Sequence, residues 1–293
     1  MLIGSHIHMK KPDFLLGAVN EAHQYGENTL MVYTGSPHNT ERVPIEEMKI
    51  EEAKQQMKQD NIAPLIVHTP HVINLANSER EETYHFDIGV LQEELVRTEK
   101  MGGQQLCLHP GEYVHQSKKT GIKNIIAALN RLLTTNEGPC ISLVNTSGEG
   151  TEIGSRFEDL VDILSGVNYP DRLSITLNTD HLFNAGYDIV HHFDEVMTEF
   201  DCQIGLDRLK VVELCDSKTP FDSHKDRHEN IGFGQIGFDA LCHIAHFKPE
   251  VPKILVTPYI NRHTPQARAP FAEEIQSLKS KCFNPQWRQQ LEQ

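Results

Sequence analysis

Eight short apolar runs, separated by segments of helical period, constrain the fold of this chain more than any other feature of its sequence. The runs are Leu2–Ile7, Leu30–Thr34, Leu65–Val67, Gln105–Leu108, Cys140–Val144, Leu173–Leu177, Leu209–Leu214 and Lys253–Val256. Amphipathic stretches such as Ile45–Gln59 and Ile88–Met101 follow the runs. Strands that alternate with helices are typical of repeated βα units and a parallel sheet. Eight such units in 293 residues predict an α/β fold, a closed (β/α)₈ TIM barrel.

Composition and spacing bound the class of protein. No Pro-, Gly- or Ser-rich linker divides the chain, so we predict a single domain over residues 1–293. The six cysteines are widely spread without a C-x-x-C pair, which predicts reduced thiols. The chain has neither a membrane-length apolar run nor a signal-peptide pattern, so we expect a cytoplasmic protein without a membrane partner. The net charge of −14 disfavours broad attraction to nucleic acid, although a local basic or metal-rich cleft could still hold phosphates.

Polar side chains gather where the predicted strands end, which is where such barrels build their active sites. They are His6, His8, His68, His71, His109, Asn178, Asp180, His181, Glu213 and Asp216, joined by Asp226 and His228 from the long polar segment Thr219–Gly234. One histidine at a strand end is more often structural than a ligand, but several that converge favour a metal site. Imidazole and carboxylate donors without thiolate suit zinc, manganese or iron, and a hydrolytic reaction would favour zinc.

Other motifs carry less information. The glycines of Gly232-x-Gly234-x-x-Gly237 follow a loop rather than a strand, so we interpret them as a turn before a helix. The sequence contains no P-loop and no G-x-S-x-G motif, which disfavours covalent nucleophilic catalysis. His191, His192, His243 and His246 are interpreted as histidines of helix surfaces.

Several strings resemble the endonuclease IV family in order and spacing over nearly the whole chain. They include Val67-His68-Thr69-Pro70, Leu108-His109-Pro110-Gly111, Asp216-Ser217-Lys218 and Lys225-Asp226-Arg227-His228-Glu229-Asn230-Ile231-Gly232. The resemblance implies a TIM-barrel hydrolase of DNA base excision repair. Members of that family use a cluster of three zinc ions to cut double-stranded DNA on the 5′ side of abasic sites.

The resemblance also assigns metal ligands. It implies that His181, Asp226 and His228 hold one zinc, and that His68 and His109 belong to a second. The other family ligand positions carry replacements, which are Val144, Asn178, Glu213 and Val256. By the resemblance, Val144 stands where the family has a glutamate that bridges two metals. A bridging carboxylate fixes the spacing of the two metals and offsets their repulsion. Its replacement by valine therefore predicts a broken dinuclear site and weak or lost activity. We therefore expect one zinc site.

Two features near the replaced positions bear on this expectation. Glu213 could join His68 and His109 as a two-histidine, one-carboxylate set, which makes it the one candidate catalytic residue. Asp180 and Glu149 are interpreted as helix-cap or solvated acids, and we expect His6 and His8 to act indirectly rather than as ligands.

Candidate DNA contacts lie in the segment after the second run and near the strand ends. They are Asn39, Arg42, His71 and Arg227, of which the two arginines are candidate phosphate contacts. His71 stands where the resemblance places a tyrosine, and Glu41 should weaken binding to phosphates.

Two alternatives stay open. One is a catalytically silent barrel that keeps one structural metal and binds DNA or another partner. The other is a metal-dependent sugar isomerase, because related barrels use similar ligands to polarise a carbonyl. Metal count and substrate distinguish the three functions.

Overall fold

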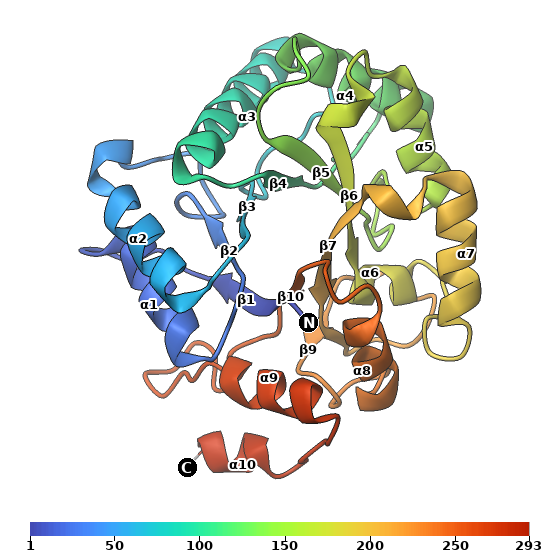
Figure 1. Cartoon of the computed structure of the whole chain (residues 1–293). Coiled ribbons are helices and arrows are strands. Elements are labelled where there is room, and N and C mark those ends of the chain that lie inside the picture. The colour runs from blue at the N-terminus through green and yellow to red at the C-terminus, as the bar shows by residue number, and fades with distance from the viewer. Residues whose placement is uncertain (293) are drawn as a thin grey trace.

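The computed structural model describes residues 1–292 and contains a closed barrel of parallel strands, seen along its axis in Figure 1. The barrel strands are β1 (Ile3–Ile7), β2 (Leu30–Tyr33), β3 (Leu65–His68), β4 (Gln105–Leu108), β5 (Cys140–Val144), β6 (Leu173–Asn178), β7 (Leu209–Leu214) and β10 (Lys253–Leu255). Strand β10 pairs with both β7 and β1, which closes the barrel. The predicted TIM barrel is confirmed, and the bounds of the eight strands differ from the predicted runs by at most one residue.

Helices surround the barrel on its outside (Figure 1). They are α1 (Phe14–Gln24), α2 (Ile50–Asp60), α3 (Glu81–Met101), α4 (Lys118–Leu132), α5 (Phe157–Gly166), α6 (Thr179–Asn184), α7 (Phe193–Gln203), α8 (Phe238–His246), α9 (Phe271–Ser280) and α10 (Trp287–Glu292), with 3₁₀ turns η1 (Ile45–Glu47), η2 (Pro170–Arg172) and η3 (Leu206–Arg208). The predicted stretch Ile45–Gln59 is divided into η1 and α2, because Lys49 between them adopts a left-handed backbone with φ of 53°.

The apolar side chains form two layers. A large cluster lies between the strands and the helices, and a smaller one fills the inside of the barrel. The inner cluster consists of Met31, Ile66, Cys107, Val144, Val211 and Ile254, with Val256 against it. Buried side chains inside such a barrel make it a packed core rather than a pore, so polar groups collect at the ends of the strands.

The long polar segment Thr219–Gly234 is mostly irregular, as predicted, but it contains the short strand β9 (His228–Glu229). Strand β9 pairs in antiparallel fashion with β8 (Asp216–Ser217), which follows β7. The buried Asp216 carboxylate accepts hydrogen bonds from the backbone N–H groups of Gly232, Gly234 and Ile236 at 2.8–3.0 Å. These contacts hold the segment over the ends of β6 and β7.

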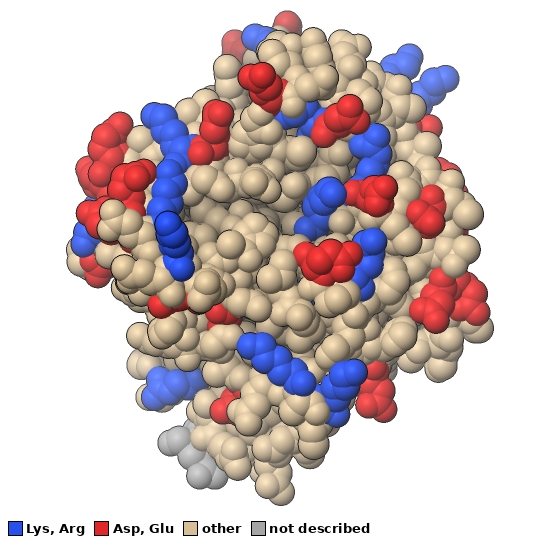
Figure 2. All heavy atoms as spheres, viewed as in Figure 1, with Lys and Arg blue, Asp and Glu red and all other residues tan. Residues whose placement is uncertain are grey.

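Charge is distributed over the surface without one dominant patch on the face shown in Figure 2, where basic and acidic side chains are interspersed. Within residues 1–292, none of the helices has the length and apolar character that crossing a membrane requires.

Candidate metal centre

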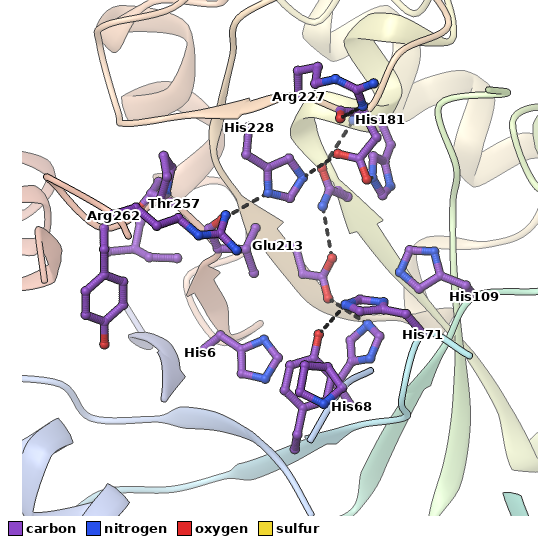
Figure 3. Close-up of a pocket in the computed structure, with 18 of the residues that line it drawn as sticks. His6, His68, His71, His109, His181, Glu213, Arg227, His228, Thr257 and Arg262 are labelled. Carbon is purple, nitrogen blue, oxygen red and sulfur yellow. Dashed lines mark hydrogen bonds and ion pairs between the residues drawn. The ribbon is translucent and has the colours of Figure 1, made fainter. Parts of the chain in front are cut away.

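A wide cavity of about 1010 Å³ opens at the carboxyl ends of the strands. Its lining includes the predicted metal ligands together with additional histidines and basic side chains: His6, His8, His38, His68, His71, His109, His181, His228, Asn178, Glu213, Asp226, Arg227, Lys218 and Arg262. Figure 3 shows that the labelled side chains, such as His6, His109 and His228, reach the cavity from different sides of the barrel. Closure of the sheet therefore brings together residues that lie far apart in the sequence.

Four side chains form a compact group on one side of this cavity. Each of Asp180, His181, Asp226 and His228 offers a ligand atom, and these atoms lie within 4.8 Å of one another. Asp226 lies between the two histidines, with Oδ2 3.4 Å from Nε2 of His181 and Oδ1 3.1 Å from Nε2 of His228. Two imidazoles and two carboxylates are a donor set that zinc and similar divalent ions accept.

The two imidazoles are oriented by backbone carbonyls. Nδ1 of His181 lies 2.7 Å from the carbonyl oxygen of Asn145, and Nδ1 of His228 lies 2.9 Å from that of Val256. A ring that donates through Nδ1 presents the lone pair of Nε2, which is how metal-binding histidines are commonly held. Nε2 of His228 is buried, and although Oδ1 of Asp226 lies 3.1 Å away, it makes no well-directed hydrogen bond with the described residues, so its position fits a metal ligand.

The charges of this group stabilise one another. Burial raises the pKa of the Asp226 carboxyl, but His181 and His228 outweigh that effect and hold the pKa well below its usual range. Burial opposes protonation of His181, yet the hydrogen bond and charge of Asp226 raise its pKa above the ordinary value. Asp226 is therefore an anion whose two neighbours supply positive charge, and a divalent cation could supply that charge in place of the protons.

A second group of imidazoles, His68, His71 and His109, lies near the ends of β3 and β4 (Figure 3). The ring centroid of His68 is 5.3 Å from that of His109 and 5.5 Å from that of His71. Burial, followed by neighbouring imidazoles, lowers the pKa of His109 and brings that of His71 to about 4. His71 and His109 are therefore neutral bases at neutral pH. His109 links the two groups, because its ring centroid also lies 5.7 Å from that of His181.

The four positions interpreted as replaced ligands differ in what they contribute here. Val144 is fully buried in the inner apolar cluster and Val256 packs against that cluster, so their side chains offer no donor atom. Glu213 and Asn178 face the cavity, and Nδ2 of Asn178 donates to Oε2 of Glu213 at 3.0 Å. Oε1 of Glu213 approaches Nε2 of His68 to 3.7 Å, whereas Glu213 forms neither a hydrogen bond nor an ion pair with His109.

The candidate DNA contacts are placed differently from one another. Arg227 is exposed at the cavity, where it forms an ion pair with Glu149 at 3.3 Å. His71 lines the cavity, and its Nε2 lies 2.7 Å from the Tyr33 hydroxyl. Asn39 is exposed on the loop after β2 but does not line the cavity.

The prediction that Arg42 contacts phosphate needs correction. Its side chain is only 3% exposed, and its Nε donates to Oε1 of Glu94 at 2.6 Å. A guanidinium neutralised by a buried carboxylate has no free charge to offer to DNA, so Arg42 organises its loop instead.

The structure also places residues that sequence reasoning undervalued. Asp180, interpreted as a cap or solvated acid, is fully buried, and its Oδ2 lies 4.0 Å from Nε2 of His228. Lys218 and Arg262 line the cavity, and neither forms an ion pair among the described residues. Asp180 could have been found from its position beside His181 at a strand end, but Arg262 follows β10 in a loop without any motif.

Comparison with known proteins agrees with this fold and shows the family. A family model described as a xylose isomerase-like TIM barrel matches residues 19–281. A probable endonuclease 4 of Enterococcus faecalis is 46% identical over 98% of this chain and 97% of its own length. The crystal structure of endonuclease IV from Thermus thermophilus superposes with a TM-score of 0.82 at 23% identity, covering 96% of this chain and 98% of that one. A D-tagatose 3-epimerase-like protein gives a TM-score of 0.69 at 15% identity, over 96% and 99% of the two chains, which shows a shared fold alone.

Fold and donor set thus define a xylose isomerase-like barrel with a histidine- and carboxylate-lined mouth. The sequence similarity to probable endonuclease 4 proteins extends over nearly the full length of both chains. Within this class, the chain therefore belongs to the endonuclease IV family.

Proposed function

We propose that this protein is a metal-dependent phosphodiesterase that cuts double-stranded DNA 5′ to abasic sites, at a lower rate than relatives with a full set of metal ligands. The observation that carries this proposal is the group Asp180, His181, Asp226 and His228, whose ligand atoms lie within 4.8 Å of one another at the mouth of an endonuclease IV-type barrel. Zinc suits this donor set. Bound there, it would offset the negative charge of a phosphate during hydrolysis.

The side chains around this group suit a phosphate backbone. Lys218, Arg227 and Arg262 line the same cavity and place positive charge at its mouth, although the whole chain carries a net charge of −14. Phosphate contacts supply much of the affinity of proteins for DNA, and a local basic rim can act against an acidic background. Arg227 is also tied to Glu149, so we expect Lys218 and Arg262 to be freer to bind phosphate.

The reason for a lower rate of DNA incision lies in the side chains next to the Asp226 group. The apolar side chains of Val144 and Val256 occupy part of the barrel mouth, and neither can hold a metal or fix the distance between two metals. The amide of Asn178 is neutral, so it adds no anionic ligand either. Positioning of a scissile phosphate would therefore depend chiefly on the Asp226 group and on the basic rim.

The test is incision of an end-labelled duplex that contains one abasic site, by zinc-loaded protein. We expect Asp226→Asn to lower incision by about 100-fold, because it removes the carboxylate shared by both imidazoles. Asp222→Asn, an exposed acid of the same segment, is the matched control and should retain the rate. The Enterococcus faecalis relative, assayed in parallel, should be faster by about tenfold or more.

Two results would count against the proposal. Incision no faster than that of Asp226→Asn would indicate a silent barrel that keeps a structural metal. A rate equal to that of the relative would show that the valines and Asn178 do not impair the site.

A further inference from the structure

Helix α3 carries two large apolar side chains on its solvent side. Phe86 is 57% exposed and Val96 is 47% exposed, and among residues 1–291 only Val72 and Phe221 are comparably exposed large apolar side chains. The helix has 21 residues and lies on the outside of the barrel between α2 and α4 (Figure 1). A single exposed apolar side chain is ordinary, but two on one face of one helix indicate a contact surface.

The exposed residues of this face have the spacing of a helix contact seam. Six of them recur at alternating intervals of four and three positions: Glu82, Phe86, Gly89, Glu93, Val96 and Lys100. At about 100° per residue they share an arc of about 80°, and the buried Ile88, Leu91 and Leu95 lie on the other side of the helix. Alternation of three and four is the pattern by which two helices pack side by side.

Gly89 is the seam residue that the fold of one chain does not require. Its φ is not in the left-handed region, and a Cβ added there would meet no atom within 4 Å. Glycine is also among the least favourable residues inside a helix. In a contact between helices, however, a residue without a side chain leaves room for a longer one on the other helix.

The seam is complementary to itself when two copies of α3 run antiparallel and cross at Leu91. Residues that lie equally far before and after Leu91 then face each other, and a two-fold axis repeats each pair. The facing pairs are Phe86 with Val96, Glu82 with Lys100, and Gly89 with Glu93. Apolar thus meets apolar, acid meets base, and the glycine meets a long side chain.

Charge favours the antiparallel arrangement over a parallel one. In the antiparallel pair, the Glu82 carboxylate of one copy meets the Lys100 ammonium of the other at each end of the seam. In a parallel pair, Glu82, Glu93 and Lys100 would each face the same residue, which places like charges together. The Glu93 carboxylate is already paired within its own helix, 2.8 Å from the guanidinium of Arg97, so it brings no unpaired charge to Gly89.

We propose that α3 forms a two-fold, antiparallel interface between two copies of this chain. The seam shares no residue with the lining of the cavity, so association does not use the candidate metal centre. Because only Phe86 and Val96 of the seam are apolar, the interface belongs with small, transient contacts, and we expect a dissociation constant on the order of 10–100 µM. This proposal does not depend on the proposed function, because association is measured without DNA or metal.

The test is sedimentation velocity of the full chain at concentrations from about 1 to 500 µM. Val96→Ser should raise the dissociation constant by about tenfold or more, because each dimer loses two apolar contacts. Val72→Ser, which changes a valine of similar exposure outside α3, is the matched control and should leave the constant unchanged. Circular dichroism melting shows whether each variant is folded.

Charge reversal tests which residues face each other. Glu82→Lys and Lys100→Glu each place like charges opposite one another and should raise the dissociation constant by about threefold or more. The double variant Glu82→Lys/Lys100→Glu restores opposite charges and should bring the constant back. The proposal is overturned if the natural chain stays monomeric over the whole range, which would leave the seam to a different partner. It is also overturned if Val96→Ser dimerises like the natural chain, or if the double variant is weaker than both single variants.

Discussion

Arg42 joins the loop after β2 to helix α3 through an ion pair that water hardly reaches. Its guanidinium contacts Glu94, whose carboxylate also accepts from the Thr34 hydroxyl, and its NH1 group donates to the carbonyl oxygens of Asn39 and Glu41. A single side chain thus fixes the loop that borders the cavity near Pro37 and His38. Its role is to shape the mouth of the barrel.

At this scale we predict that Arg42→Met destabilises the protein by about 3–5 kcal/mol, because it leaves Glu94 charged, buried and unpaired. The double variant Arg42→Met/Glu94→Leu should recover much of this loss, since it removes both charges. Denaturant unfolding of the three proteins measures the effect. Unchanged stability in Arg42→Met, combined with a weaker salt dependence of DNA binding, would restore the phosphate-contact interpretation.

Helix α9 anchors the segment that carries Asp226 and His228. The fully buried carboxylate of Glu274 accepts from the Ile231 N–H at 3.0 Å, from Asn230 Nδ2 at 3.1 Å and from the Thr257 hydroxyl at 2.6 Å. Burial raises the pKa of Glu274 to about 7, and these three hydrogen bonds only partly oppose that rise. An element on the outside of the barrel therefore sets the position of ligands at its mouth.

We predict that the stability contributed by Glu274 of helix α9 depends on pH. Because the pKa of Glu274 is higher in the folded chain than the ordinary 4.5, its contribution to stability is fully present below about pH 4.5 and is lost as pH rises to about 7. The loss is on the order of 3 kcal/mol. Glu274→Gln should remove this part of the slope, whereas the neighbouring Glu273→Gln should keep it. Urea unfolding at pH 5 and pH 8 tests this prediction. An equal change in the free energy of unfolding between the two pH values in the natural chain and in both variants would contradict it.

At the scale of the whole molecule, a metal bound by Asp180, His181, Asp226 and His228 would link helix α6, which follows β6, to the segment after β7. Both attachments lie on one closed barrel, so the ion would stabilise the whole cooperative unit. A ligand at about 100 times its dissociation constant stabilises a folded protein by about 2.7 kcal/mol.

We therefore predict that a chelator lowers the melting temperature by about 4–5 °C, and that added zinc restores it. Asp226→Asn should show a smaller shift of the melting temperature on chelation, because it lacks the carboxylate that lies between His181 and His228. Differential scanning calorimetry measures both. Equal melting temperatures with and without chelator would show that no ion contributes to the stability of the fold.

The sequence alone determined the barrel and the order of its polar strand ends. Apolar runs and helical periods are local properties, so the eight strands could be predicted to within one residue, and His181, Asp226 and His228 could be named from short motifs. The tertiary structure decided the rest, because contacts such as Arg42 with Glu94 or Asn178 with Glu213 join residues brought together only by closure of the sheet. It buried Asp180 beside His228, removed Arg42 from the candidate DNA contacts and turned Glu213 toward His68. Which side chains share a low-dielectric site, and hence which charges need a partner, is a property of the closed barrel and not of any one segment.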